Sequence, residues 1–96
     1  MITSFGDAAT EDVFHGRGGA RVRKRPADVM AAAQRNLDII NAAADLNDLR
    51  APPGNLLEKL KGSLAGQWSV RVNDPWRLLF KWQGNNAHGV RLLDYH

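Results

Sequence analysis

Hydrophobic and polar residues alternate along two neighbouring stretches, residues 68–73 and 77–82. The apolar positions are Trp68, Val70 and Val72 in the first stretch and Leu78, Phe80 and Trp82 in the second. A period of two over this length predicts two antiparallel strands, each with one face in the core. Cross-strand partners share a face, so we expect a register that keeps all six side chains inside. The expected pairs are Val72 with Leu78, Val70 with Phe80 and Trp68 with Trp82.

The same register makes predictions for the loop and the outer face of this hairpin. It places Asn73 opposite Arg77 and leaves residues 74–76 (Asp74, Pro75 and Trp76) as the loop, where a proline without an N–H does no harm. The outer face is then expected to carry three cations, Arg71, Arg77 and Lys81.

The stretch from Pro26 to about Leu46 shows the spacing of an amphipathic helix. Proline suits the first turn of a helix, and Asp28 suits its positive end. Apolar residues recur at steps of three and four, at Met30, Ala33, Leu37, Ile40 and Ala44. Polar residues occupy the other side, at Gln34, Asp38, Asn41 and Asp45. We expect this helix to pack on the sheet.

The N-terminal region predicts a short strand, a short helix and a basic linker. Residues 2–5 are expected to form a first strand. Asp7 is a candidate N-cap for a helix that runs to about His15 and stops at Gly16, with Val13 and Phe14 packed inward. Residues 16–25, GRGGARVRKR, are basic and lack periodicity. They are either a flexible connection or an arm that contacts phosphate.

The rest of the chain completes a small α+β domain. Residues 47–55 contain Pro-Pro-Gly and are expected to be a loop. Leu56, Leu57 and Leu60 are expected to be apolar anchors. Residues 84–86 predict a turn and residues 87–96 a final strand, with Val90 and Leu92 buried and Arg91 outward. We therefore expect one domain, residues 1–96, in which two N-terminal helices pack on an antiparallel sheet.

Net charge alone leaves open both a nucleic acid ligand and an ordinary solvated surface. The distribution of charge favours nucleic acid, because the acidic residues lie mostly in the N-terminal half while the sheet region is cationic. The 96 residues carry a net charge of +3 with a pI near 9.8, and nine of the 13 basic residues are arginine, which suits phosphate recognition. The absence of cysteine excludes disulfides and cysteine-ligated zinc. We see no signal peptide and no apolar run near the ~20 residues of a membrane span, so we expect a soluble cytoplasmic protein.

The candidate chemistry is that of a nuclease without a metal or another cofactor. The three histidines, His15, His88 and His96, are too scattered for a zinc site. What remains is a set of cations and the C-terminal Asp-Tyr-His at residues 94–96. RNA cleavage needs no metal when the adjacent 2′-hydroxyl attacks the phosphate, because a protein can orient the ribose, move protons and stabilise the added charge. At this point two simpler interpretations stay open: His96 as a frayed end and Arg77 as an exposed sheet charge.

The run LKGSLAGQWSVRVNDPWRLLFKW, followed by a terminal LLDYH, resembles the HigB-type toxins of the RelE superfamily. The stretch DLRAPPGNLLEKLKG and the early VFHG and RVRKRP segments resemble the same group, so the resemblance covers nearly the whole chain. It implies a RelE-like α+β fold and a toxin that cuts mRNA in the ribosomal A site. It also implies a helix-turn-helix antitoxin (HigA-like), usually encoded next to the toxin, through which alone the complex contacts DNA.

The resemblance also implies roles for individual residues. Lys61 and Arg77 match the phosphate-binding cations of the family. The C-terminal catalytic residues are matched by Asp94, Tyr95 and His96, with His96 as the proton-transfer group. The further candidate RNA-binding cations are Arg71, Lys59, Lys81, Arg23 and Lys24.

Two departures from the family pattern leave an alternative open. Some members carry a histidine at the position of Glu58, and an acid there cannot stabilise phosphate. Residues 18–20 resemble an insertion in the basic linker. The alternative is a non-enzymatic RNA-binding or antitoxin-binding module whose catalytic site has decayed.

Overall fold

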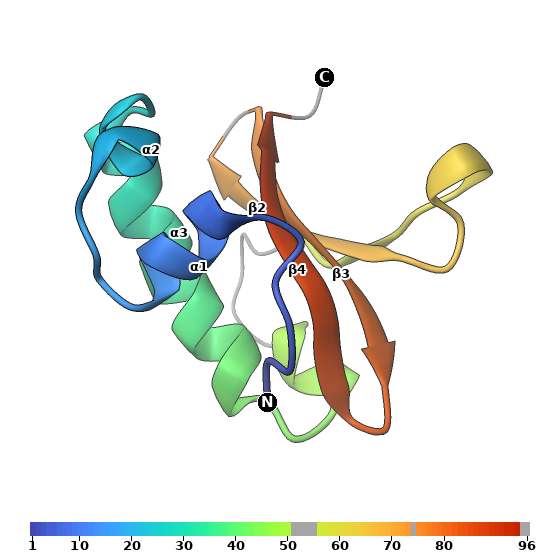
Figure 1. Cartoon of the computed structure of the whole chain (residues 1–96). Coiled ribbons are helices and arrows are strands. Elements are labelled where there is room, and N and C mark those ends of the chain that lie inside the picture. The colour runs from blue at the N-terminus through green and yellow to red at the C-terminus, as the bar shows by residue number, and fades with distance from the viewer. Residues whose placement is uncertain (51–55, 74, 95–96) are drawn as a thin grey trace.

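Helices cover one face of a four-stranded antiparallel sheet in the computed structural model, which describes residues 1–50, 56–73 and 75–94 (Figure 1). The sheet order β1-β2-β3-β4 follows the chain. The strands are β1 (Glu58–Lys59), β2 (Trp68–Asn73), β3 (Trp76–Gln83) and β4 (Asn86–Asp94). The helices are α1 (Ala8–Phe14), α2 (Ala20–Arg23) and α3 (Ala27–Ala42), with 3₁₀ turns η1 (Leu46–Leu49) and η2 (Gly62–Leu64). The α+β fold predicted from the sequence is confirmed.

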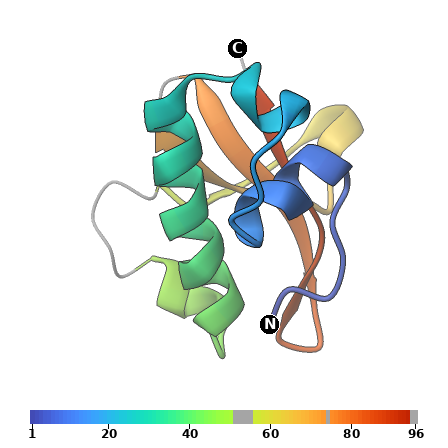
Figure 2. The same cartoon turned by 60° about the vertical axis from the view of Figure 1, so that its left-hand side comes forward.

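The main core lies between α3 and the inner face of the sheet. Figure 2 shows α3 lying across that face. Its fully buried members include Leu37, Ile40, Leu78, Phe80 and Val90. Trp68, Val72 and Trp82 are partly buried and pack against this cluster. The predicted inward faces of the hairpin and of the long helix are therefore confirmed, because both periodicities place their apolar residues on the side where the two layers meet.

The predicted N-cap of α1 is present. Asp7 Oδ1 accepts a hydrogen bond of 2.7 Å from the backbone N–H of Thr10, and Gly16 takes a φ of +68° after the helix. Val13 is buried and Phe14 packs on the core, as expected. The linker prediction was wrong in part, because residues 20–23 form the single helical turn of α2, with Val22 packed against the core.

The long helix ends at Ala42, four residues before the predicted end at Leu46. The carboxylate of Asp48 accepts the N–H groups of Ala44 and Asp45 at 3.0 and 3.1 Å, and Asp45 caps η1. These local hydrogen bonds compete with the helical ones and start a new turn at Leu46, which continues into the predicted loop 47–55. Ala44, expected on the apolar face, is exposed, whereas Ala43 and Leu49 are buried. Residues 51–55 lie outside the described residues.

The N-terminal segment covers the free edge of β4 without forming the predicted strand. Ile2 and Phe5 make isolated parallel bridges to Ala87 and Val90. Backbone hydrogen bonds of 2.8–3.1 Å join residues 1–6 to this edge. The N–H groups of Ala87 and Val90 on this edge are thus paired, which protects this part of the edge from association with other chains.

The predicted hairpin register was wrong by two residues. The structure pairs Val70 with Leu78, Trp68 with Phe80 and Arg71 with Arg77, with an irregularity between Arg71 and Asn73. A slip of two residues keeps each side chain on its predicted face, so the alternation could not distinguish the two registers. Trp76, predicted in the loop, opens β3 opposite Asn73; Asp74 lies outside the described residues.

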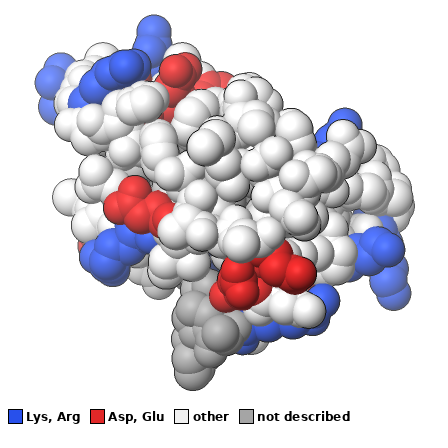
Figure 3. Space-filling view, turned by 90° about the horizontal axis from the view of Figure 1, so that it is seen from below, with Lys and Arg blue, Asp and Glu red and all other residues white. Residues whose placement is uncertain are grey.

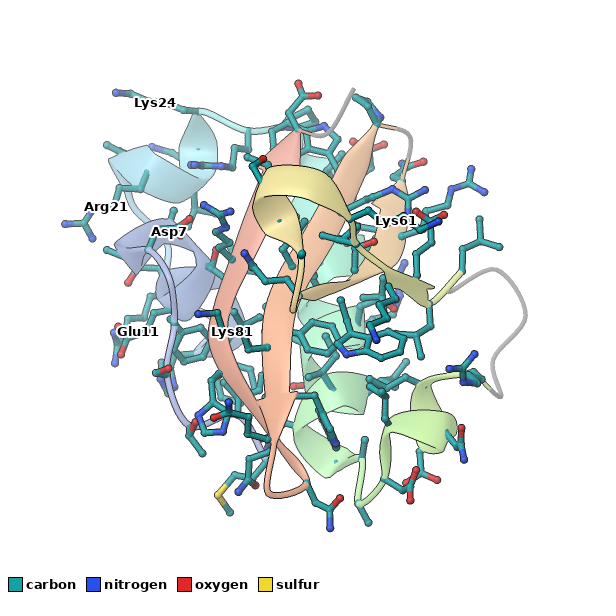
Figure 4. The ribbon with its side chains drawn as sticks, turned by 90° about the vertical axis from the view of Figure 1, so that its right-hand side faces the viewer. Asp7, Glu11, Arg21, Lys24, Lys61 and Lys81 are labelled. Atoms are coloured by element: carbon teal, nitrogen blue, oxygen red, sulfur yellow. The ribbon has the colours of Figure 1, made fainter. Side chains whose placement is uncertain are left out.

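Residues 58–66 fold over the outer face of the sheet (Figure 4). Ser69 and Leu79, which the alternation of the two strands places on that face, are therefore fully buried. Leu60 is buried too, as predicted, whereas the expected anchor Leu56 is 53% exposed. The turn at Gly84 and Asn85 has two residues at positive φ, as a tight hairpin requires, and β4 then buries Val90 and Leu92 as predicted.

Candidate RNA-binding and catalytic site

Two arginines face each other across the outer face of the β2–β3 hairpin. Arg71 and Arg77 are direct cross-strand partners, and both are partly buried. A guanidinium presents several N–H donors in a planar fork that suits a phosphate group, so two arginines on one face make it a candidate phosphate site.

Ser69 holds the guanidinium of Arg77. The Nη1 of Arg77 donates to the hydroxyl of Ser69 at 3.3 Å, and the serine is fully buried. A hydroxyl that packing keeps in place restricts the positions that the arginine can take. Sequence reasoning missed Ser69, since alternation gave it an exposed position.

Lys61 lies in an open hollow beside this face. The hollow has a volume of about 410 Å³ and is lined by Glu58, Lys59, Leu60 and Lys61. Lys61 immediately precedes η2 and is exposed. The β1–β2 register sets Glu58 opposite Ser69, on the same face as Arg71 and Arg77. A carboxylate therefore stands among the cations, and it disfavours a bound phosphate by like-charge repulsion.

The end of β4 comes next to the arginine pair. Leu93 is the cross-strand partner of Arg77, and Asp94 is the partner of Trp76. Leu93 therefore shares the outer face of the sheet with Arg71 and Arg77. Asp94, the next residue along the strand, lies on the inner face. The other two predicted catalytic residues, Tyr95 and His96, lie outside the described residues.

The remaining predicted RNA-binding cations are dispersed. Lys81 is exposed and pairs with His88 in the β3–β4 ladder. The ammonium of Lys59 lies 5.9 Å from the ring centre of Trp68, and Arg50 contacts the same ring at 5.8 Å. Figure 3 shows the basic side chains of one face in separate groups, with acidic groups between them.

Arg23 and Lys24 belong to a different part of the surface. Both are exposed, Arg23 at the end of α2 and Lys24 directly after it. Figure 4 shows Lys24 beside α2, across the width of the molecule from Lys61. The structure therefore brings Arg71, Arg77 and Lys61 to the outer side of the sheet and leaves the α2 cations apart.

Arg91 is a further cation that the site prediction left out. The β3–β4 register sets it opposite Leu79, on the same outer face of the sheet as Arg77. Its predicted outward orientation is therefore confirmed. A Cβ added to Gly6 would lie 3.1 Å from the Cβ of Arg91, so the N-terminal segment packs closely along it. The alternation of β4 was the signal that could have included Arg91.

No helix in the described part of the chain is long and apolar enough to cross a membrane. No three histidine, aspartate or glutamate side chains of residues 1–50, 56–73 and 75–94 come together as a possible metal site.

Known proteins are similar to this chain in sequence. The model of the HigB-like toxins, RelE-like toxins of type II toxin–antitoxin systems, matches residues 3–96. Toxin HigB-1 of Vibrio cholerae is 47% identical over 95 residues, which cover 99% of this chain and 94% of that protein. Endoribonuclease HigB of Proteus vulgaris is 30% identical over 71 residues, 74% of this chain and 76% of that protein.

Solved structures show the same fold. A chain of the heterotetrameric YoeB–YefM toxin–antitoxin complex of Staphylococcus aureus superposes with a TM-score of 0.61 at 22% identity, covering 100% of this chain and 98% of that chain. A second YoeB–YefM complex from the same organism gives a TM-score of 0.56. The family match spans nearly every residue, including the strands that carry Arg71 and Arg77. The chain belongs to the HigB-like family of RelE-like toxins.

Proposed function

We propose that this toxin is an endoribonuclease that cuts mRNA on the ribosome and so arrests translation. One observation carries the proposal: Arg71 and Arg77 face each other beside the end of β4, with Ser69 holding Arg77. The name of the Proteus vulgaris relative, an endoribonuclease, supports the same activity. A cationic pair on a rigid hairpin suits a phosphate that gains negative charge during the reaction.

The proposed reaction uses the RNA's own nucleophile. The 2′-hydroxyl loses its proton and attacks the adjacent phosphorus, the bond to the 5′-oxygen breaks, and that oxygen takes up a proton. The products are a 2′,3′-cyclic phosphate and a 5′-hydroxyl end. No step requires a metal ion, because the protein supplies cations and the ribose supplies the nucleophile.

Each candidate residue has a role in this scheme. Arg77 stabilises the charge that develops on the phosphate, and Lys61 binds the phosphate from the hollow beside η2. His96 moves a proton, as an imidazole does well near neutral pH, with Asp94 and Tyr95 beside it in the sequence. The other proposed cations hold the flanking RNA, at Arg71, Lys59, Lys81, Arg23 and Lys24.

We also propose that the toxin works in the cytoplasm with two partners, an antitoxin and the ribosome. A helix-turn-helix antitoxin of the HigA type neutralises the toxin in the cytoplasm, and the complex contacts DNA through the antitoxin. The ribosomal A site positions the mRNA, because the outer face of this small sheet is too limited to align a flexible strand for in-line attack without help.

A second function is favoured by Glu58. Its carboxylate lines the hollow of Lys61 and shares the face of Arg71 and Arg77. An acid at this point weakens phosphate binding, which suits a toxin relative that retains antitoxin or RNA binding after its catalytic site has decayed.

Expression of the chain alone in a bacterial host tests the proposal. We expect growth arrest and reduced translation, both reversed by the protein encoded next to the toxin gene. Purified toxin should cut mRNA in a translating mixture and leave the same free RNA largely intact. EDTA should not change any chemical step that can be assayed without the ribosome. Normal growth at demonstrated expression would favour the decayed module, and rapid degradation of free RNA would contradict ribosome dependence.

Deletion of His96 tests the proton-transfer role separately. The shortened chain should lose cleavage while its melting temperature and antitoxin affinity stay close to those of the full chain. If the shortened chain still arrests growth, His96 is a frayed end and another group moves the proton.

A further inference from the structure

A side chain of the helical layer is bonded to the strand that carries Arg71. The Nδ2 of Asn36 on α3 donates a hydrogen bond of 3.0 Å to the backbone carbonyl of Arg71 on β2. The two residues are 35 positions apart in the sequence, so the bond joins the two layers of the fold. From the helical side of the sheet, it reaches a residue whose side chain lies on the outer face.

The carbonyl that accepts this bond lies at an irregularity of the hairpin. The β2–β3 ladder pairs Arg71 with Arg77. The next pair joins Asn73 to Trp76, so β2 uses two steps where β3 uses one. Val72 is the extra residue, which is the arrangement of a β-bulge. Bulges occur often beside active sites, because the local bend and the added twist redirect a neighbouring side chain.

Packing alone does not require an amide at position 36. Asn36 is partly buried, and Ala33 and Ile40, one helical turn before and after it, are fully buried. Asparagine is a poor helix former in the interior of a helix, and an apolar residue would extend the face that covers the sheet. The role of the amide is therefore best explained by the group that it holds, the carbonyl of Arg71.

Two uncharged groups thus restrain the arginine pair. The hydroxyl of Ser69 accepts a hydrogen bond from the side chain of Arg77, and the amide of Asn36 donates one to the backbone of Arg71. A side chain that is held in place before the substrate arrives loses less conformational entropy when it binds a phosphate. Neither group carries a charge, so neither offsets the positive charge of the pair.

We propose that Asn36 is a positioning residue for the nuclease reaction. It fixes the bulge of β2, so that the guanidinium of Arg71 is held beside Arg77 on the face that binds RNA. The inference rests on the proposed function. Asn36 lies on the helical side of the sheet and does not touch the RNA, so its effect passes through Arg71.

The test uses Asn36→Leu, which keeps the approximate size of the side chain and removes the donor. Leucine forms helices better than asparagine, so the melting temperature should stay close to that of the unchanged chain. The matched control is Asn41→Leu, at a partly buried position of the same helix. The Oδ1 of Asn41 accepts the backbone N–H of Ile2 at 2.9 Å, so the control also removes a long-range bond to the backbone, but to the N-terminal segment and not to the hairpin.

We expect Asn36→Leu to lower the single-turnover rate of mRNA cleavage in a translating mixture by about tenfold, the scale of one net hydrogen bond. Asn41→Leu should leave that rate unchanged. If Asn36 acts through Arg71, then Asn36→Leu should cause no further loss in a chain that already carries Arg71→Ala. Normal cleavage by Asn36→Leu, or a full further loss in the Arg71→Ala chain, would overturn the inference. If Asn36→Leu unfolds, Asn36→Ala takes its place with the same expectations.

A second readout does not depend on cleavage. NMR relaxation of the Nε of Arg71 measures how firmly its side chain is held. Asn36→Leu should increase the motion of this side chain, and Asn41→Leu should not. If the unchanged chain does not cleave mRNA, the proposed nuclease function fails, but the relaxation result still decides whether Asn36 orders Arg71. Equal motion in all three proteins would overturn the inference even where cleavage falls.

Discussion

At the scale of single residues, Arg77 is the side chain whose replacement should remove catalysis without disturbing the fold. It lies on the outer face of the sheet and is partly buried, outside the main core. Arg77→Ala should keep the fold and lower the rate of mRNA cleavage by about 10²- to 10³-fold, as expected for loss of a group that stabilises developing charge. Cleavage in a translating extract measures the rate, and circular dichroism verifies the fold. Arg35→Ala is the control; a variant that cleaves normally, or that is inactive because it is unfolded, would contradict this role.

Glu58 allows a test in the opposite direction. Its carboxylate repels a phosphate bound near Lys61 and Arg71, so Glu58→Gln should raise RNA affinity and cleavage by about two- to fivefold, the scale of one exposed charge pair. The gain should shrink at high ionic strength because salt screens exposed charges. Titration of RNA at two salt concentrations measures it, with Glu11→Gln on α1 as the control. A loss of activity in Glu58→Gln would show that the carboxylate has a positive role.

At the scale of elements, α1 is short and depends on its cap. The seven residues of α1 are fewer than an isolated helix needs for stability. Asp7 supplies the capping hydrogen bond, so Asp7→Ala should lower the free energy of unfolding by about 1 kcal/mol. Urea denaturation measures the change. Asp28→Ala is the matched control, because Asp28 lies in the first turn of α3 and makes no capping bond there. Equal effects of the two substitutions would mean that the loss comes from the helix dipole alone.

The hairpin shows how an element can be predicted correctly with the wrong partners. Alternation gave the two strands and their inner faces, yet the register slipped by two residues. The consequence is functional, because the slip sets Arg71 and not Asn73 opposite Arg77. The arginine pair on which the proposed activity depends was therefore a result of the structure, although both residues had been candidates.

At the scale of the whole molecule, one buried hydrogen bond joins the two ends of the chain. The hydroxyl of Thr10 on α1 accepts from the N–H of Leu92 on β4 at 2.8 Å, and Thr10 is only 1% exposed. Thr10→Val keeps the shape of the side chain but leaves that N–H without its partner, so the free energy of unfolding should fall by about 1–3 kcal/mol. Thr3→Val is the control, because the Thr3 hydroxyl also bonds to β4, at Ala87 and His88, but from an exposed position where water can replace it. A variant as stable as the unchanged protein would show that water or a backbone shift replaces the bond.

The sequence by itself determined the features that depend on neighbouring residues. The spacing of Met30, Ala33, Leu37 and Ile40 defined the helix that covers the sheet, and Asp7 and Gly16 marked both ends of α1. The motif residues also identified the family, and the match of residues 3–96 to the HigB-like toxins confirms it. These features were predictable because periodicity, capping and turn chemistry act over a few residues.

Only the tertiary structure decided what lies next to what. The burial of Ser69 depends on residues 58–66, which fold over the outer face, and the early end of α3 depends on the carboxylate of Asp48. A hollow lined by Val13, Val22 and Met30 exists because the basic linker forms the turn of α2 beside α1 and α3. Alternation fixes the face of a strand residue but leaves its partner open to slips of two, and the packing of distant segments selects among them.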